Sequence, residues 1–167
     1  MDYLHEFVIH CKKITLDEAK SHYARPFIVQ REKFQEHGTS SKSTLMFDVS
    51  RLSEILKATE PKDQKRRFFY LEKDASTIGR AEGADIHIQH ISISKQHARL
   101  DLTGGNPVLT DLGSTNGTFV NDTKLDPNVP TPLNDGDLVS FGSLGFKFFH
   151  APTFFNVVAN MLKKIGA

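Results

Sequence analysis

The stretch from Phe68 to Phe149 is a series of short apolar segments in which hydrophobic and polar residues alternate. Turn-forming residues separate the segments at intervals of roughly ten residues, a spacing typical of sandwich folds. Because each short strand buries one face, such a series folds as two packed sheets. We therefore predict an all-β sandwich. Its strands are expected at Phe68–Leu71, Thr77–Gly79, Ile86–Ile88, Ala98–Leu102, Val108–Leu109, Thr118–Val120, Leu138–Phe141 and Phe146–Phe149.

Residues 1–66 have a different pattern. Thr15 and Glu18 have the spacing of a capping box, which predicts a short helix that ends before Pro26. The apolar run Phe27–Val29 predicts a strand, and we favour its integration into the sandwich. A second strand is expected at Leu45–Phe47, and helical turns around Leu52, Ile55 and Leu56.

The C-terminal segment, residues 151–167, changes to helical spacing. Its apolar residues form one stripe: Phe154, Val157, Val158, Met161, Leu162 and Ile165. We expect this helix to pack on the sandwich, and a helix that docks a partner is the alternative if the stripe is exposed. The chain is thus divided into an N-terminal extension of residues 1–66, a β-domain of residues 67–150 and a C-terminal amphipathic helix.

Composition narrows the classes of partner. The net charge of +1 provides no global field to attract nucleic acid or a membrane surface. No apolar run approaches the ~20 residues that span a bilayer. Cys11 is the single cysteine, which excludes an internal disulfide and favours a reducing compartment. We therefore expect a cytoplasmic protein.

Two polar clusters lie between the predicted strands. The first combines Gly79-Arg80 with Ser94-Lys95-Gln96-His97, and the second is the loop of residues 112–118. Arginine offers a planar fork of donors that suits phosphate oxygens, and a glycine allows close approach to the backbone. A loop of small polar residues with two glycines can present backbone N–H groups on one face. These residue types suit the binding of a phosphate group and the peptide that carries it.

The order and spacing of these clusters resemble the forkhead-associated (FHA) domain over residues 67–150. The resemblance rests on Gly79-Arg80, on Ser94-x-x-His97 and on the run from Asp111 to Asn121. Leu133-x-x-Gly136-Asp137 with Val139, Phe141 and Gly142 is similar to the closing strands of that family. The resemblance implies an FHA-type β-sandwich of two sheets with apical loops that bind phosphothreonine in a partner protein, as a module of Ser/Thr kinase signalling.

The same resemblance implies a role for individual residues. Arg80 would pair with the phosphate, and Ser94, Lys95 and Thr115 would contact it. Asn116 would hold the peptide backbone beside the phosphothreonine. The residues that would shape the site are Gly79, His97, Gly117 and Asn121. Specificity is expected from residues 89–93, with His90 and Ser92 as candidates, and from residues 122–132.

Four other functions can be weighed from the sequence: catalysis, metal binding, phosphate-independent assembly and binding of the chain's own phosphorylated loop. An enzyme is not expected, because no phosphate-loop or nucleophile-elbow motif occurs, and no cofactor is expected. A metal site at His87 and His90 is not expected, because this spacing in a strand sends the rings to opposite faces. A phosphate-independent assembly domain is the main alternative. The loop 38–44 adds a further hypothesis, in which a phosphorylated Thr39 or Thr44 occupies the pocket of its own domain or that of a neighbour.

Overall fold

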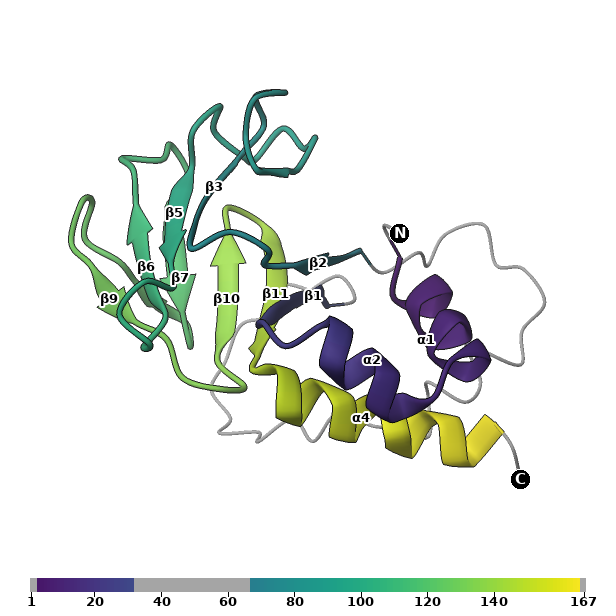
Figure 1. The fold of residues 1–167 in the computed structure, drawn as a ribbon. Helices are drawn as coiled ribbons and strands as arrows, with labels where there is room; N and C mark the ends of the chain where they lie inside the picture. The colour runs from purple at the N-terminus through teal and green to yellow at the C-terminus, as the bar shows by residue number, and fades with distance from the viewer. Residues whose placement is uncertain (1–2, 32–66, 166–167) are drawn as a thin grey trace.

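The computed structural model describes residues 3–31 and 67–165 (Figure 1). Two helices, α1 (Leu4–Lys13) and α2 (Leu16–His22), precede the first strand, and α4 (Ala151–Ile165) follows the last. The strands are β1 (Phe27–Gln30), β2 (Phe68–Tyr70), β3 (Ala75–Gly79), β4 (Ile86–His87), β5 (Ala98–Asp101), β6 (Val108–Asp111), β7 (Thr118–Val120), β8 (Thr123–Lys124), β9 (Thr131–Pro132), β10 (Leu138–Phe141) and β11 (Leu144–Phe149).

The strands form two sheets, in the orders β2-β1-β11-β10-β7-β8 and β4-β3-β5-β6-β9. All the pairings are antiparallel except that of β3 with β4. The prediction of an all-β sandwich with N-terminal helical elements and a C-terminal helix is therefore confirmed. Short alternating segments form this fold because every second side chain of a strand points to the same face, so the apolar side chains of each strand fill the space between the sheets.

The main core fills the space between the sheets. Its fully buried members come from both sheets and include Ile28, Ile78, Leu100, Phe141 and Phe148. Seven phenylalanines are among the largest fully buried side chains of the described residues: Phe7, Phe27, Phe141, Phe146, Phe148, Phe154 and Phe155. Because a buried phenylalanine contributes about 1.5–3 kcal/mol, these rings account for much of the hydrophobic stabilisation.

Strand β1 lies inside the first sheet, between β2 and β11. Phe27 pairs with Tyr70 on one side and with Phe149 on the other. Its three apolar residues are all buried, because Ile28 points into the main core while Phe27 and Val29 point to the opposite face. A domain boundary between residues 66 and 67 would therefore separate β1 from β2 and β11, the two strands with which β1 pairs directly.

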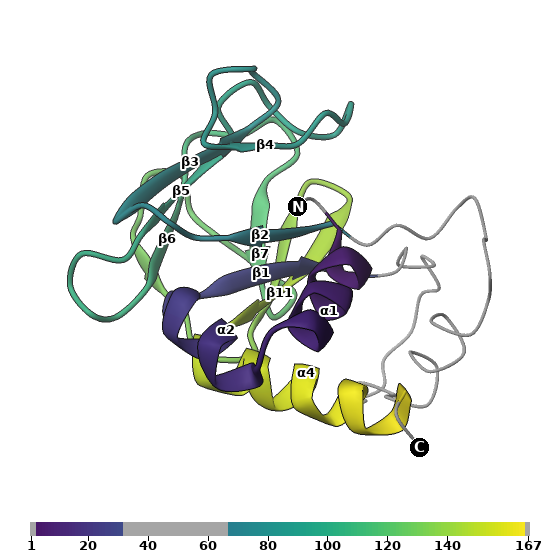
Figure 2. The same cartoon turned by 45° about the vertical axis from the view of Figure 1, so that its right-hand side comes forward.

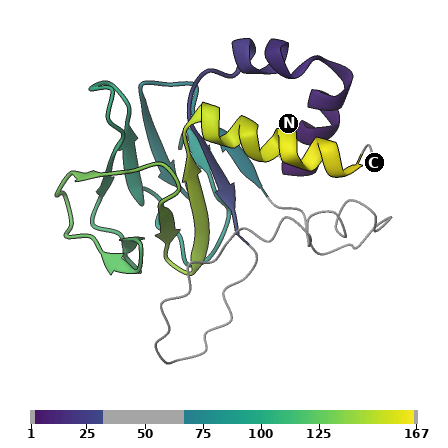
Figure 3. The same cartoon turned by 90° about the horizontal axis from the view of Figure 1, so that it is seen from below.

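The helices α1, α2 and α4 cover the outer face of the first sheet (Figures 2 and 3). A second buried cluster forms there, in which Phe154 of α4 stacks on Phe27 with ring centroids 4.0 Å apart. Phe7 of α1 contacts both rings. The described part of the C-terminal stripe is thus covered by the sandwich, as expected, and is not exposed for a partner.

Several expectations can be compared directly with the described residues. The capping box at Thr15 is present, with its hydroxyl and the Glu18 carboxylate both bonded to backbone N–H groups. Helix α1 was not predicted. The expected strand at residues 45–47, the helical turns at residues 52–56 and the loop at residues 38–44 lie outside the described residues.

Four connections meet at one end of the sandwich, which we call the apical end. They are residues 80–85 after β3, 88–97 before β5, 112–117 between β6 and β7, and 142–143 between β10 and β11. Strand order and direction bring them together, because β3, β6 and β10 end where β5, β7 and β11 begin.

Candidate functional site

Gly79 allows two apical connections to touch. A Cβ atom built on Gly79 would collide with the backbone carbonyl oxygen of Lys95. The close approach lets the backbone N–H of Arg80 donate to Ser94 O over 2.9 Å, and the N–H of Ala81 donate to Lys95 O over 3.1 Å. The glycine is therefore needed for contact between backbones.

The Arg80 side chain is exposed at this junction. Its Nε donates to the carbonyl oxygen of Ile93 over 3.1 Å, which fixes the direction of the guanidinium group. Within residues 3–31 and 67–165, no carboxylate forms an ion pair with Arg80. An oriented guanidinium group with unused donors is suited to a bidentate anion.

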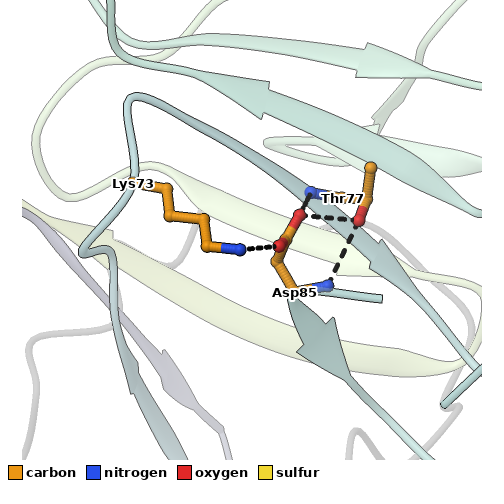
Figure 4. Close-up of polar contacts among 3 residues, drawn as sticks. All are labelled: Lys73, Thr77 and Asp85. Atoms are coloured by element: carbon orange, nitrogen blue, oxygen red, sulfur yellow. Dashed lines mark hydrogen bonds and ion pairs between the residues drawn. The ribbon is translucent and has the colours of Figure 1, made fainter. Parts of the chain in front are cut away.

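A polar network holds the base of the connection that carries Arg80 (Figure 4). Asp85 accepts hydrogen bonds from the N–H and the hydroxyl of Thr77, both over 2.8 Å, and from the Lys73 ammonium group over 2.5 Å. The Lys73 and Thr77 bonds lower the pKa of Asp85. Because β4 pairs with β3 over only two residues, these contacts reinforce a short pairing and thereby support residues 80–85.

Ser94 and Thr115 join the two polar clusters. The Ser94 hydroxyl accepts from the backbone N–H of Thr115 over 3.0 Å and lies 3.3 Å from the Thr115 hydroxyl. Ser94 is half-buried and Thr115 is exposed. The two predicted phosphate contacts are thus neighbours in space although 21 positions separate them in the sequence.

His97 lies behind these residues and is fully buried. Its Nδ1 accepts from the Ser94 N–H over 3.1 Å, so the proton must be on Nε2, which donates to Gly117 O over 3.1 Å. Burial lowers the pKa of His97, although its bond to Gly117 and the charge of Asp111 oppose that shift. A neutral histidine therefore connects the loop before β5 to the loop before β7.

Asp111 organises the second of these loops, and its role was not predicted. It is 2% exposed and accepts from Gly113 N, Ser114 N, Ser114 Oγ and Thr118 Oγ1 over 2.6–3.0 Å. Burial alone would raise the pKa of Asp111, but the hydrogen bonds to Ser114, Thr118 and Gly113 outweigh it, and the pKa is lowered. The loop 112–117 is therefore folded around a buried carboxylate.

Asn116 is exposed at the tip of that loop. Its Nδ2 donates to the carbonyl oxygen of Ser92 over 2.9 Å. This leaves the side-chain oxygen and one N–H for a ligand backbone. Gly117, which follows, has φ of +82° and its carbonyl oxygen accepts from His97 and from the N–H of Gly142. The positive φ explains the glycine at this position.

Two of the predicted site residues, Lys95 and Asn121, form no side-chain hydrogen bond with the other predicted site residues in the part of the chain that the structure describes. Lys95 is exposed, and no acidic side chain within the described residues forms an ion pair with it. Asn121 follows β7 at the end away from Asn116, has φ of +49° and bonds Asp137 and the N–H of Leu138. Asn121 therefore supports the turn between β7 and β8, and it does not contact Asn116 as a neighbour in the loop would.

The described residues contain no group of three or more His, Cys, Asp or Glu side chains placed to hold a metal ion. Within residues 3–31 and 67–165, none of the helices combines the length and hydropathy needed to cross a bilayer.

Comparison with protein families gives one match at this part of the chain. The FHA domain family matches residues 76–142, which contain every residue predicted to bind the phosphopeptide or to shape its site. An FHA domain-containing protein of Arabidopsis thaliana is 44% identical over 73 residues, which are 42% of this chain and 19% of that protein. The glycogen accumulation regulator GarA of Mycolicibacterium smegmatis is 34% identical over 84 residues. That match covers 50% of this chain and 51% of GarA, so the chain spans about half the length of that relative.

A solved structure has the same fold. The crystal structure of the FHA domain of the CT664 protein from Chlamydia trachomatis superposes with a TM-score of 0.51. The superposition covers 75% of this chain and 96% of that domain, at 20% sequence identity.

Proposed function

We propose that this protein, which belongs to the FHA-domain family through residues 76–142, binds phosphothreonine in partner proteins at the apical end of its sandwich. FHA domains are phosphopeptide-binding modules. The observation that carries the proposal is the convergence of Arg80, Ser94 and Thr115, one cation and two hydroxyl groups, from three separate loops, with exposed Lys95 next to Ser94 in the chain. No carboxylate within the described residues neutralises the two cations.

Each group has a defined task in this proposal. The Arg80 guanidinium group binds two phosphate oxygens, and the Lys95 ammonium group adds a third charged contact. Ser94 and Thr115 donate hydroxyl hydrogen bonds. Hydrogen bonds to charged groups contribute about 1.5–3 kcal/mol each, so three or four of them bring a micromolar affinity within reach after the peptide is ordered.

Asn116 fixes the direction of the peptide. Its bond to Ser92 O holds the amide in place, and the free carbonyl oxygen accepts from a backbone N–H beside the phosphothreonine. Gly79, His97 and Gly117 act indirectly, because they set the distance between the loops. Because these contacts already hold the loops, less conformational freedom is lost on binding, which lowers the cost of association.

In this proposal, the protein is a binding module and not an enzyme. Its relative GarA is named a regulator. The FHA sandwich is proposed to include β1 together with residues 67–149, since β1 lies between β2 and β11. A phosphate-independent assembly domain is the competing function, and it would use other surfaces of the same fold.

Titration calorimetry with a phosphothreonine peptide library and its unphosphorylated copies tests the proposal. We expect binding only to phosphorylated peptides, and at least a tenfold loss of affinity in Arg80→Ala with the fold retained. Arg99→Ala is the matched control, because Arg99 is exposed on β5 and pairs with Asp101. Equal affinity for both peptide forms would favour the assembly domain.

A phosphorylated Thr39 or Thr44 of the same chain is a second proposed ligand. The observation that supports it is the position of the flanking residues: Arg31 N bonds Gly145 O beside the start of β11, and Arg67 O accepts from Gln30 N. Both ends of residues 32–66 are therefore attached near the apical end. After kinase treatment, we expect reduced binding of an added phosphopeptide in the wild type but not in a Thr39→Val/Thr44→Val variant; equal binding in both would exclude this ligand.

A further inference from the structure

The turn between β10 and β11 consists of two residues, Gly142 and Ser143, at the apical end of the sandwich (Figure 1). The residues that flank it, Phe141 and Leu144, pair directly. Gly142 has φ of +55°, a conformation that the first residue of such a turn often adopts and that favours glycine. None of the groups proposed to contact the ligand belongs to this turn, yet the turn contacts two of the loops that carry them.

Gly142 lies directly against the carbonyl group of Ser92. A Cβ atom built on Gly142 would collide with Ser92 O and would lie 2.9 Å from Ser92 Cβ and Oγ. Ser92 O is also the acceptor of the hydrogen bond from Asn116 Nδ2, over 2.9 Å. A side chain at residue 142 would therefore push away the acceptor that orients the Asn116 amide.

Ser143 adds two hydrogen bonds to Ser92. Its N–H and its hydroxyl donate to Ser92 Oγ over 3.2 and 3.0 Å. The Ser92 hydroxyl in turn donates to His90 Nδ1 over 2.8 Å, because this nitrogen also accepts from the Ser92 N–H and so carries no proton. The Ser92 side chain is thus attached to the turn, which fixes the position of the neighbouring carbonyl oxygen.

The backbone that follows Asn116 is held by the same turn. The Gly142 N–H donates to Gly117 O over 3.0 Å, and His97 Nε2 bonds the same oxygen over 3.1 Å. Asn116 is therefore held at two points, its amide group at Ser92 O and its backbone at Gly117 O. Both points contact Gly142.

We infer that Gly142 is a positioning residue for phosphopeptide binding, which acts on Asn116 through Ser92 O and Gly117 O. The inference rests on the proposed function, in which Asn116 binds the peptide backbone beside the phosphothreonine. A displaced Asn116 amide loses a hydrogen bond between neutral groups, which corresponds to roughly a three- to tenfold loss of affinity. The groups that contact the phosphate keep their own hydrogen bonds, so discrimination against the unphosphorylated peptide persists.

Fluorescence anisotropy in a double-mutant cycle tests the inference, with the tightest phosphothreonine peptide of the library and its unphosphorylated copy as ligands. The variants are Gly142→Ala, Asn116→Ala and the two combined. Gly136→Ala is the matched control. Gly136 also has a positive φ, +86°, but it precedes β10 at the opposite end of the strand, where a Cβ atom would meet only Lys147 Cε at 3.7 Å. Both glycine variants thus carry the same kind of backbone strain, and only Gly142→Ala disturbs the apical loops.

We expect Gly142→Ala to weaken phosphopeptide binding three- to tenfold in the wild-type background and less than about twofold in the Asn116→Ala background. Gly136→Ala should change the affinity less than about twofold in both. In NMR spectra of the free protein, the Asn116 side-chain amide signals should shift in Gly142→Ala and stay in place in Gly136→Ala. Equal losses in the two backgrounds, or equal losses for the two glycine variants, would overturn the inference and leave the phosphothreonine proposal intact.

Thermal unfolding establishes that each variant is folded at the temperature of the titrations. If Gly142→Ala is not, Ser92→Ala takes its place in the cycle, because it removes the hydroxyl that Ser143 bonds and adds no Cβ atom. A loss of affinity confined to the background with Asn116 then supports the inference, and an equal loss in both backgrounds overturns it. If phosphorylated and unphosphorylated peptides bind alike, the proposed function fails and the inference fails with it.

Discussion

Replacing Asp111 with asparagine removes a negative charge from the interior of the loop that carries Thr115 and Asn116. In the structure, one carboxylate oxygen accepts from Gly113 N and Ser114 N, and the other accepts from the hydroxyls of Ser114 and Thr118. The asparagine oxygen can keep the two backbone bonds. Its NH2 group then faces the two hydroxyls, which must turn to accept.

The cost can be estimated from these four bonds. Each changes from a bond to a charged acceptor, worth about 1.5–3 kcal/mol, to a neutral bond worth about 1 kcal/mol. The four differences amount to about 2–8 kcal/mol, and the lower desolvation cost of a neutral asparagine offsets part of this loss. We therefore expect Asp111→Asn to lower the free energy of unfolding by about 2–4 kcal/mol, with a fall in melting temperature on the order of 10 °C. Phosphopeptide affinity should also fall, because the same bonds position Thr115 and Asn116.

Urea denaturation followed by circular dichroism measures the first effect, and titration calorimetry measures the second. Asp101→Asn is the control, because Asp101 accepts from Thr103 N and Oγ1 in the same local pattern but is more exposed and lies outside the site. Since the pKa of Asp111 is lowered in the folded protein, its contribution is complete above the ordinary carboxyl value of 3.8 and is lost as the pH falls through the lowered value. The reasoning is refuted if both variants lose the same small amount of stability.

Two further variants test the contacts between the loops. Burial lowers the pKa of His97 in the folded protein. Below the ordinary value of 6.5, His97 therefore takes up a proton in the unfolded chain but stays neutral in the folded protein, so the free energy of unfolding should decrease as the pH is lowered through that range. His97→Gln should lower the melting temperature at pH 8 and reduce this pH dependence in thermal unfolding; an unchanged dependence would mean that other groups cause it. Gly79→Ala should weaken both stability and phosphopeptide binding, because its methyl group meets Lys95 O, whereas Gly83→Ala has nothing within 4 Å and should change neither.

The strands of the main core were predictable because their side chains alternate. The predictions at Thr118–Val120 and Leu138–Phe141 agree with β7 and β10 residue for residue. Strands β8 and β9 were not predicted, since they have two residues each, none of them buried, and are held by backbone pairing. Alternation is a signal of burial, so a strand without a buried face leaves no such pattern.

Helix α1 was not predicted, although the spacing of its apolar residues is helical. Leu4, Phe7, Val8 and Cys11 have helical spacing and are buried together against the sheet. Burial raises the pKa of the Cys11 thiol to about 11, which fits a residue that packs and does not react. The position of β1 inside the sheet was harder to predict from the sequence. Its partner β11 lies more than a hundred residues away, and local spacing does not encode such a pairing.

The residue types of the candidate site were predicted, but most of the contacts that join them were not. The bonds from Thr115 N to Ser94 and from Asn116 to Ser92 depend on how the two sheets bring distant loops together. Asp111 could have been identified, because an aspartate two residues before a glycine is a common local cap of a turn. The resemblance implied that Asn121 helps to shape the site beside Asn116, although the strand β7 between them places Asn121 at the other end of the sandwich.

The pairing of β1 with β11 also sets an order for folding. Phe27 is synthesised early, yet its partner Phe149 emerges more than a hundred residues later. During synthesis, the β11-facing edge of β1 therefore lacks its native partner, and the Phe27 ring lacks the stacked Phe154 ring, until the C-terminal part of the chain has emerged. Contacts of such long sequence separation form slowly. We expect the sheet to close, and the helical layer to assemble over it, only after the last strand and α4 have left the ribosome.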